Sequence, residues 1–440
     1  MYWIYSALLA AALLITLPYW LIQGWRHGKY RAGVRERLGN APARLLSGTS
    51  RAAIWIHAVS VGEVVAMIGL IAELKRRHAD LRVVVSTTTD TGQELARREF
   101  GEENVFYFPL DFGFAIRPYL RALRPQLFVL AETEFWPNVL RLTKSSGTRV
   151  AVVNARISDR SLPGYRRIRF LLKNVLQNVD VFLAQTEEDA RRLQEIGAVL
   201  ERVQVAGNLK FDASVPLEQP IVARLRRALN DANAGPVLVC GSTVEGEEEL
   251  LVCAFKDVLR THPAAVMILA PRHPERFGGV GDLLRRENLR FVQRTLWNDE
   301  PLAGGVLLLN TIGELAAMYA LADVGFVGGS LVRRGGHNVI EAARHGVAIV
   351  VGPHTENFRD IVRLFEQHEA VRVVEPEELS KALLELLASD EARAALGRRA
   401  LETVNSQIGA TQRTADALDK LLGSLSAPAG DFFRPAAQVR

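Results

Sequence analysis

Polar side chains and glycines in the second half of the chain stand directly after apolar runs, where they could bind a nucleotide. Arg272 follows "AVMILAP" and could donate charge-assisted hydrogen bonds to a phosphate. Gly313 and Glu314 open a helical stretch after "GVLLLNT", and a helix start offers free N–H groups and the positive end of the helix dipole. Glu341, one turn into the helical stretch after "RRGGHN", could accept hydrogen bonds from two ribose hydroxyls. Together these residues predict a nucleotide site, although Glu341 alone is equally well explained as a first-turn helix charge.

A smaller polar set in the first half could supply acid–base chemistry. Glu63 starts a helical stretch after "AAIWIHAV", Glu132 and Glu134 follow "PQLFVLA", and Lys210 lies in "GNLKFD". A carboxylate in a cleft facing a phosphate site predicts a general base, and a nearby lysine predicts stabilisation of a developing anion. The alternative for Glu63 is a helix N-terminal charge. Glu132 and Glu134 share a face only if the strand continues through them.

Several other kinds of site are excluded. The chain has no D-x-D sequence, which argues against metal-dependent handling of a sugar nucleotide. It has no GxxxxGK[ST] phosphate-binding loop, and "GFVGGS" lacks the full GxGxxG pattern of a dinucleotide fold. His337, His345 and His354 share no metal-ligand spacing, so we predict no metal site.

The elements that must position these residues alternate between strand and helix. From Ala52 onward, apolar runs suited to strands buried on both faces are separated by helical stretches. A proline-bearing segment follows residue 215, and the alternation starts again at "VLVCGST". This pattern predicts an α/β fold of two doubly wound domains, 52–215 and 216–425 with its terminal helices, followed by a tail, 426–440. Ligands of such sheets bind at the carboxyl ends of the strands, so we expect a site in a cleft between the domains.

The N-terminus predicts a membrane anchor. Residues 1–25 carry no charged side chain and have aromatic residues at both ends, which is typical of a helix that crosses a bilayer. A basic segment, 26–51, follows and would keep the two domains on the cytoplasmic side. The alternative is an amphipathic or buried helix that only docks on the membrane. The net charge of +5 fits an anionic partner only weakly. Cys240 and Cys253 are the only cysteines and indicate structural thiols in a reducing compartment.

The ordered motifs resemble those of the Kdo transferase family, membrane-anchored enzymes of lipopolysaccharide assembly. The resemblance rests on segments spread over nearly the whole chain: "HAVSVGE", "ETEFWPN", "GNLKFD", "GSTVEGEEE", "APRHPERF", "GGHNVIEAA" and "GPHTENF". It implies the GT-B fold and an inverting transfer of 3-deoxy-D-manno-octulosonic acid (Kdo) from CMP-Kdo to the lipid A precursor, lipid IVA. It also implies no cofactor, no metal in the transfer step, and an inner-membrane location with the catalytic domains facing the cytoplasm.

The same resemblance implies roles for particular residues. Glu63 would be the catalytic base, and Glu132 and Lys210 would support the transition state. Expected partners are CMP-Kdo, the lipid A precursor and an anionic membrane surface, with no nucleic acid. The alternatives are another GT-B enzyme that uses a UDP-sugar, either a glycosyltransferase or an epimerase, or a catalytically inactive membrane scaffold. The residues that would bind CMP are Pro271, Arg272, Ile312, Gly313, Glu314, Asn338, Val339, Ile340 and Glu341.

Overall fold

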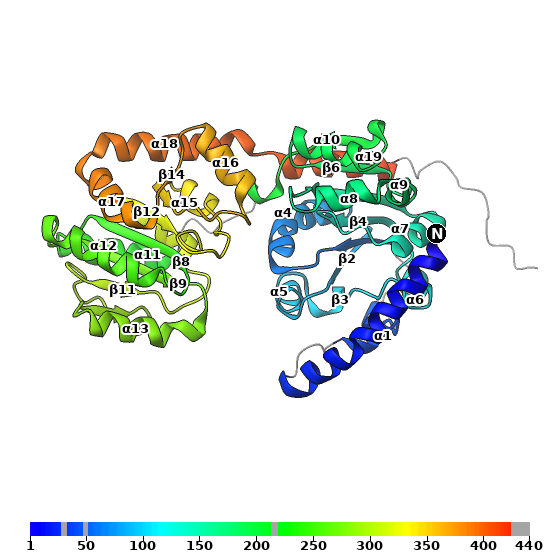
Figure 1. Ribbon diagram of the computed structural model, residues 1–440, viewed down its shortest axis with the longest axis horizontal. Coiled ribbons are helices and arrows are strands. Elements are labelled where there is room, and N and C mark those ends of the chain that lie inside the picture. Colours follow the sequence, from blue (N-terminus) through cyan, green and yellow to red (C-terminus); the bar gives the residue numbers. More distant parts are fainter. Residues whose placement is uncertain (28–32, 47–51, 213–218, 424–440) are drawn as a thin grey trace, which may run out of the picture. The chain divides into compact units, whose positions relative to one another are not determined.

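The chain forms two compact units, each built on one parallel sheet (Figure 1). The computed structural model describes residues 1–27, 33–46, 52–212 and 219–423. The first unit comprises Met1–Ala213 together with Ile408–Arg440, and the second comprises Ser214–Gln407. The prediction of an α/β fold with two doubly wound domains is confirmed. The predicted tail, 426–440, lies outside the described residues.

The sheet of the first unit has seven parallel strands in the order β3-β2-β1-β4-β5-β6-β7. The strand order reverses between β1 and β4, and the crevice beyond the carboxyl ends of strands at such a point is where ligands bind in doubly wound sheets. Glu63 follows β1 and Glu132 follows β4, so the topology brings these two sequence segments to one place. The strands are β1 Ala53–His57, β2 Arg82–Thr87, β3 Val105–Tyr107, β4 Pro125–Ala131, β5 Arg149–Ala155, β6 Val181–Ala184 and β7 Val203–Val205.

Helices cover both faces of this sheet because successive strand residues alternate between two apolar cores. Trp55 belongs to the core under α6, α7, α9 and α10, whereas its neighbours Ile54 and Ile56 belong to the core under α4, α5 and α19. The short helices α2 Val34–Arg37 and α3 Ala43–Leu46 precede the sheet. The covering helices are α4 Val61–Arg77, α5 Asp90–Phe100, α6 Gly113–Leu123, α7 Pro137–Ser145, α8 Leu162–Arg167, α9 Arg169–Leu176, α10 Glu187–Glu195 and α19 Ala410–Gly423.

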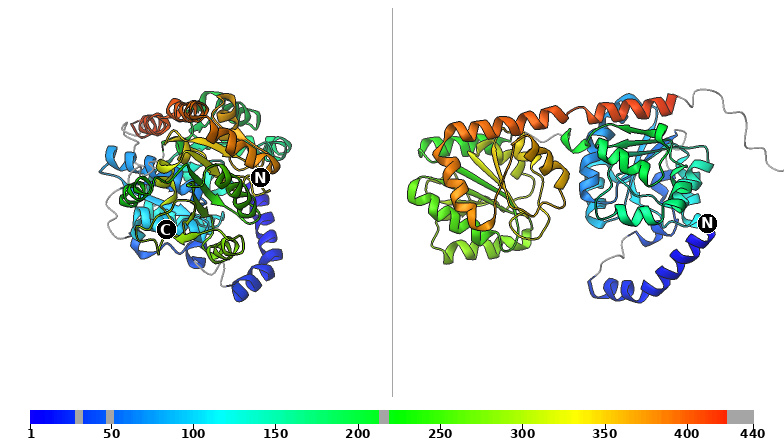
Figure 2. Two further views of the ribbon diagram at one scale, coloured as in Figure 1. Left: turned by 90° about the vertical axis from the view of Figure 1, so that its left-hand side faces the viewer. Right: turned by 45° about the horizontal axis from the view of Figure 1, so that its top comes forward.

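The last described helix, α19, belongs to the first unit, which corrects the predicted domain boundary. Figure 2 shows this helix, coloured red, running along the first unit. Its apolar side chains, including Leu418, join the core that also contains α4. Arg77 of α4 reinforces this packing with ion pairs of 2.6 Å to Asp416 and to Asp419. The sequence-based boundary placed everything up to residue 425 in the second domain. An apolar stripe shows that a helix packs on something, but it does not show which sheet the helix covers.

The second unit has a sheet of the same kind, with seven parallel strands in the order β10-β11-β9-β8-β12-β13-β14. Its strands are β8 Val237–Thr243, β9 Val266–Pro271, β10 Phe291–Gln293, β11 Val306–Leu308, β12 Val324–Val327, β13 Ala348–Val351 and β14 Arg372–Val373. Its helices are α11 Pro220–Asp231, α12 Glu248–Thr261, α13 Phe277–Arg286, α14 Leu315–Met318, α15 Ile340–Ala343, α16 Arg359–Gln367, α17 Leu379–Ala388 and α18 Asp390–Gln407.

The N-terminal helix α1, Tyr2–His27, packs on the first unit through its first two turns. The Arg141 guanidinium lies 4.6 Å from the centre of the Tyr2 ring, and Asn138 Nδ2 donates a 3.0 Å hydrogen bond to Ser6 Oγ. Within the described part of the chain, no helix meets the length and apolarity needed to cross a bilayer. The membrane anchor therefore stays a prediction.

Candidate active site

The Glu63 carboxylate accepts hydrogen bonds from the residues that precede α4. Glu63 Oε2 accepts a 2.8 Å hydrogen bond from the Val59 N–H, and Oε1 accepts a 3.1 Å hydrogen bond from Ser60 Oγ. Ser60 is the N-cap residue and Glu63 lies three positions later, the spacing of a capping box. The side chain is 8% exposed. Glu63 therefore does act as a helix-terminal charge, and its carboxylate is held in one place by that role.

The same carboxylate has the ionisation behaviour that a base needs. Burial, followed by repulsion from Glu132, raises the pKa of Glu63 to about 7. Glu134 adds to the rise, while the hydrogen bonds from Val59 and Ser60 oppose it. A general base works best when its pKa lies near the operating pH. Glu63 thus combines a fixed position with a proton affinity suited to neutral solution.

Glu132 and Lys210 form an ion pair beside Glu63. Lys210 Nζ lies 3.6 Å from Glu132 Oε1, and both side chains are only partly exposed. Glu132 is the first residue after β4 and has a left-handed backbone with φ of 57°. Such a conformation costs free energy in a residue with a side chain. The turn aims the Glu132 carboxylate away from the strand's own alternation, a feature that the spacing of Glu132 and Glu134 could not reveal.

The segment that carries Lys210 is held by two asparagines. Asn154 Oδ1 accepts a 3.0 Å hydrogen bond from the Leu209 N–H, and Asn208 Oδ1 accepts one of 3.0 Å from the Lys210 N–H. Asn154 is buried and also has a left-handed backbone, with φ of 53°. Asn154 stood out in the sequence only as a polar residue at a strand end, and Asn208 gave no signal beyond its place before Lys210. Both are positioning residues for the Glu132–Lys210 pair.

In the second unit, Arg272 and Glu341 come together from different strand ends. The Arg272 N–H donates a 2.9 Å hydrogen bond to the Thr243 carbonyl, which fixes the start of the loop after β9. Burial raises the pKa of Glu341, whereas a hydrogen bond from Asn338 and the positive charge of Arg272 lower it. Asn338 Nδ2 lies 3.4 Å from Glu341 Oε1, and Asn338 Oδ1 accepts from the Ile340 N–H at 3.2 Å.

The remaining predicted CMP residues differ in what they can offer. Val339 and Ile340 are buried, so only their backbone atoms could contact a nucleotide. Ile312 is 70% exposed and Gly313 has φ of 91°, which places both on an open turn. Glu314 is already engaged, because Arg294 Nη2 lies 2.9 Å from its Oε1. Pro271 ends β9 and carries Arg272 directly behind it.

The glycine pair before Asn338 is required by the backbone. Gly335 and Gly336 have φ of 87° and 73°, in the left-handed region that glycine adopts freely. A Cβ atom on Gly336 would lie 3.2 Å from the His354 carbonyl oxygen. His337, the next residue, has a pKa lowered to about 4 by burial and by the nearby Arg272 and His273, so its imidazole is neutral at pH 7.

The helices behind Gly313 and Glu341 are short. α14 spans Leu315–Met318 and α15 spans Ile340–Ala343, each of four residues. A helix of one turn has a small dipole, so a phosphate here would depend on Arg272 and on individual backbone N–H groups rather than on a helix end.

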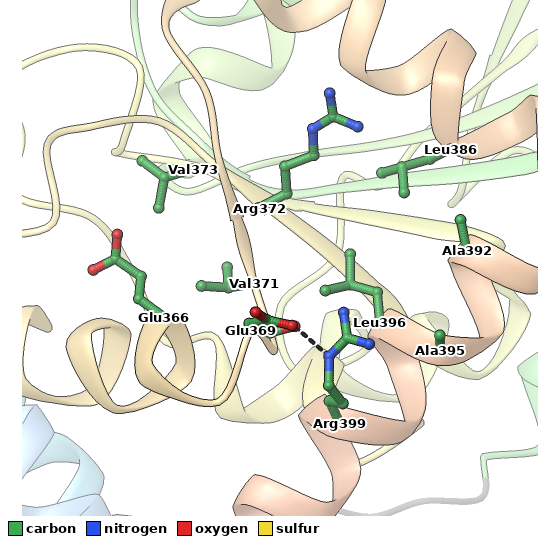
Figure 3. A pocket seen from close by; sticks show the side chains of 10 residues that line it. All are labelled: Glu366, Glu369, Val371, Arg372, Val373, Leu386, Ala392, Ala395, Leu396 and Arg399. Atoms are coloured by element: carbon green, nitrogen blue, oxygen red, sulfur yellow. Dashed lines mark hydrogen bonds between the residues drawn. The ribbon is translucent and has the colours of Figure 1, made fainter.

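A hollow of about 630 Å³ elsewhere in the second unit is separate from these loops (Figure 3). It lies between the end of α16, the start of β14 and α18, and its lining includes Glu366, Arg372 and Arg399. Arg399 Nε donates a 2.6 Å hydrogen bond to the Glu369 carbonyl, and Arg372 is paired with Glu385. Since β14 begins here, the hollow belongs to the amino ends of the parallel strands, opposite the edge that carries Arg272 and Glu341.

Comparisons with known proteins decide the family. A family model described as "3-Deoxy-D-manno-octulosonic-acid transferase (kdotransferase)" matches residues 32–213, and one described as "Glycosyl transferases group 1" matches residues 249–403. A 3-deoxy-D-manno-octulosonic acid transferase from Bordetella pertussis is 36% identical, and one from Haemophilus influenzae is 32% identical; each match covers 95% of this chain and 98% of the relative. The chain belongs to the Kdo transferase family.

This membership confirms the family that the sequence motifs indicated and identifies the chain as a Kdo glycosyltransferase of lipopolysaccharide core biosynthesis. Among solved structures, a putative UDP-N-acetylglucosamine 2-epimerase from Listeria monocytogenes matches with a TM-score of 0.58. That match covers 85% of this chain and 98% of the other at 13% identity, so it concerns the fold alone. The fold of this Kdo transferase is accordingly α/β and GT-B-like.

Proposed function

We propose that this Kdo transferase moves Kdo from CMP-Kdo to the lipid A precursor, lipid IVA, with inversion at the anomeric carbon and with Glu63 as the general base. The observation that carries the proposal is the buried Glu63 carboxylate, which lies beside the Glu132–Lys210 pair at the strand reversal of the first unit. The pKa of this carboxylate is about 7. Relatives named 3-deoxy-D-manno-octulosonic acid transferase support the sugar that is transferred.

In the proposed step, Glu63 takes the proton from a sugar hydroxyl of the acceptor. The hydroxyl oxygen forms a bond to the anomeric carbon of Kdo as the bond from that carbon to the CMP phosphate breaks on the opposite face. The phosphate oxygen keeps the bonding electrons, so one displacement inverts the configuration. Lys210 supports the reaction by opposing the charge of Glu132, which makes it easier for the neighbouring Glu63 carboxyl to lose its proton and act as a base.

The second unit supplies the proposed donor site. Arg272 would stabilise the charge that grows on the leaving phosphate. The Glu341 carboxylate would accept hydrogen bonds from the ribose hydroxyls. Its contact with Asn338 holds this carboxylate near the loop that carries Asn338. Backbone groups of Gly313, Val339 and Ile340 would complete the contacts to CMP. No metal has a role in this transfer step.

A lipid acceptor is supported by an apolar pocket next to the carboxylates of the first unit. The pocket holds about 390 Å³ and is lined by Met1, by Tyr5 of α1, by the residues after β4, and by α8 and α9. Glu134 lines the same pocket, so its apolar wall reaches the carboxylate cluster. The exposed arginines Arg167 and Arg169 are the chain neighbours of the pocket residue Ile168, and their charges suit a phosphorylated lipid. We further propose that α1 holds the enzyme at the cytoplasmic face of the inner membrane.

The direct test is incubation of the purified full-length protein with CMP-Kdo and tetraacylated lipid IVA, followed by mass spectrometry. We expect products that are heavier than the acceptor by one or more Kdo units. A parallel reaction with UDP-N-acetylglucosamine tests the alternative of a GT-B enzyme that uses a UDP-sugar. Consumption of the UDP-sugar with no Kdo transfer would replace the proposed function. CMP binding with no turnover of either donor would indicate an inactive scaffold.

A further inference from the structure

A fully buried carboxylate holds the glycine-rich turn after β12. Glu247 is 0% exposed. Its Oε1 accepts hydrogen bonds of 2.8 Å from the N–H groups of Ser330 and Leu331, and its Oε2 accepts 2.7 Å and 3.1 Å bonds from those of Gly329 and Val244. Each oxygen of the Glu247 carboxylate therefore accepts two hydrogen bonds. Nothing in the proposed reaction requires Glu247, yet few side chains in the described structure are bound by so many backbone donors.

The glycines of this turn leave room for the Glu247 carboxylate to lie against the backbone. Gly329 has φ of 71°, which a side chain would strain. A Cβ atom on Gly328 would lie 2.9 Å from Glu247 Oε2 and 2.6 Å from the Ser242 carbonyl oxygen. The "GGS" sequence thus serves a side chain of the protein itself. The N–H groups of Gly329, Ser330 and Leu331 face Glu247 and are not available to bind a phosphate.

The next residue, Glu248, holds the loop after β9. Glu248 is 0% exposed, and Arg276 Nη2 lies 3.1 Å from its Oε2. Thr243 Oγ1 donates to Glu248 Oε1 at 3.3 Å. Arg276 lies four residues after Arg272 in the same loop, so this part-buried ion pair restrains the segment that carries the proposed phosphate-binding arginine.

The sheet order explains why two adjacent glutamates can do this. β8 lies between β9 and β12, and Glu247 and Glu248 mark the start of α12 just after β8. The Glu247 carboxylate therefore contacts the loop after β12, and the Glu248 carboxylate contacts the loop after β9. Ser330 extends the connection to the loop after β13, because its Oγ accepts a 2.8 Å hydrogen bond from the Gly352 N–H. Loops after four neighbouring strands are joined through this pair.

We propose that Glu247 and Glu248 are positioning residues for donor binding: Glu247 fixes the turn that leads into Asn338–Glu341, and Glu248 fixes the Arg272 loop through Arg276. This inference rests on the proposed function, which puts the donor nucleotide at those loops. The two residues touch no reacting atom. Their removal should weaken nucleotide binding and raise KM for the donor, while kcat at saturating donor changes little.

Three glutamine substitutions in one helix turn test the proposal. Glu247→Gln would place an amide NH₂ against two backbone N–H groups. Glu248→Gln would remove the nearer of the two carboxylate charges that Arg276 contacts, the other being that of Glu245 at 3.6 Å. Glu249 is exposed on the same turn, so Glu249→Gln is the matched control. Calorimetry with CMP and donor kinetics at fixed acceptor are measured on the full-length protein, with thermal unfolding to establish the folded fraction.

We expect Glu247→Gln and Glu248→Gln to weaken CMP binding and raise KM for CMP-Kdo by about ten- to a hundredfold, as misplacement of a binding group does. Glu249→Gln should match the wild type. Arg276→Gln should reproduce the Glu248→Gln effect, and Arg276→Lys should recover part of it; this pair remains informative if Glu247→Gln does not fold. The proposal would be overturned if folded Glu248→Gln and Arg276→Gln both had the CMP affinity and the KM of the wild type. The two glutamates would then have a purely structural role. If the wild type binds CMP but transfers no Kdo, the proposed function fails, whereas the positioning role is still decided by calorimetry.

Discussion

Lys210 Nζ lies 3.6 Å from Glu132 Oε1, and the charge of Glu132 is in turn the largest electrostatic contribution to the raised pKa of Glu63. The three residues come from loops after β7, β4 and β1, and the strand order of the first sheet brings the β1 and β4 loops together. The proton affinity of the proposed base is therefore set by a neighbouring ion pair as well as by burial. This relationship can be tested without touching Glu63.

Glu132→Gln should move the acid limb of the pH–rate profile to lower pH. The substitution removes the negative charge that raises the pKa of Glu63, so Glu63 loses its proton more readily. In the wild type we expect kcat to rise with pH through a limb near 7. Lys210→Met should move the limb the other way, because the charge of Glu132 is then unopposed. Unchanged limbs in both variants would show that another group controls the pH dependence.

Glu63→Gln should become more stable relative to the wild type as the pH rises. The pKa of Glu63 in the folded protein is about 7, above the ordinary value of 4.5 for a glutamate. Between these values the unfolded chain has released the proton that the folded protein retains, so the contribution of Glu63 to stability is full below 4.5 and is lost as the pH rises through 7. The difference amounts to roughly 3 kcal/mol at most. Urea unfolding at pH 5 and pH 8 measures it, and a stability difference that does not vary with pH would contradict the raised pKa.

Arg272→Ala should weaken CMP binding by about ten- to a hundredfold, since one hydrogen bond to a charged group contributes roughly 1.5–3 kcal/mol. Isothermal titration calorimetry gives the affinity directly. Arg260 is an exposed arginine of the same unit, and Arg260→Ala is the control for a simple change in net charge. Equal affinities in the two variants would place the phosphate elsewhere, and a preference for UMP over CMP would favour a UDP-sugar enzyme.

Removal of α1 should reduce turnover of membrane-embedded acceptor while leaving CMP affinity unchanged, because the helix contacts only the first unit among the described contacts. Activity on lipid IVA in liposomes is compared for the full chain and for a chain lacking residues 2–25. Protease treatment of spheroplasts tests the orientation. Full activity of the shortened chain would show that α1 is dispensable, and digestion of the two units from the periplasmic side would reverse the proposed orientation.

The sequence was sufficient for the sheets and for the family, because buried parallel strands read as continuous apolar runs and the motifs follow them in order. Runs such as "LRVVVSTTT" and "AVMILAPRH" became β2 and β9 at nearly those positions. The same pattern could not assign α19 to its unit.

The candidate site could be predicted where the residue type itself indicates the chemistry. It could not be predicted where the role of a residue depends on its backbone conformation or on how loops pack. Arg272, Glu63 and Lys210 stand out as charges at strand ends. The left-handed backbone of Glu132 and the four N–H groups around Glu247 cannot be read from spacing, because they follow from how separate loops meet. Three consecutive glutamates at a helix start look alike in sequence, yet Glu247 and Glu248 are buried and Glu249 is exposed.

The most direct test of the proposed mechanism is kcat of Glu63→Gln at saturating CMP-Kdo and lipid IVA. Glutamine keeps the size of the side chain and an acceptor for the Val59 N–H, but it cannot take a proton. We predict a fall in kcat of at least about a hundredfold, in the range that a positioned general base contributes, with CMP affinity unchanged. Turnover per folded molecule equal to that of the wild type would contradict the assignment and leave Glu63 as a helix cap, with Glu132 or Glu134 as the base to be tested next.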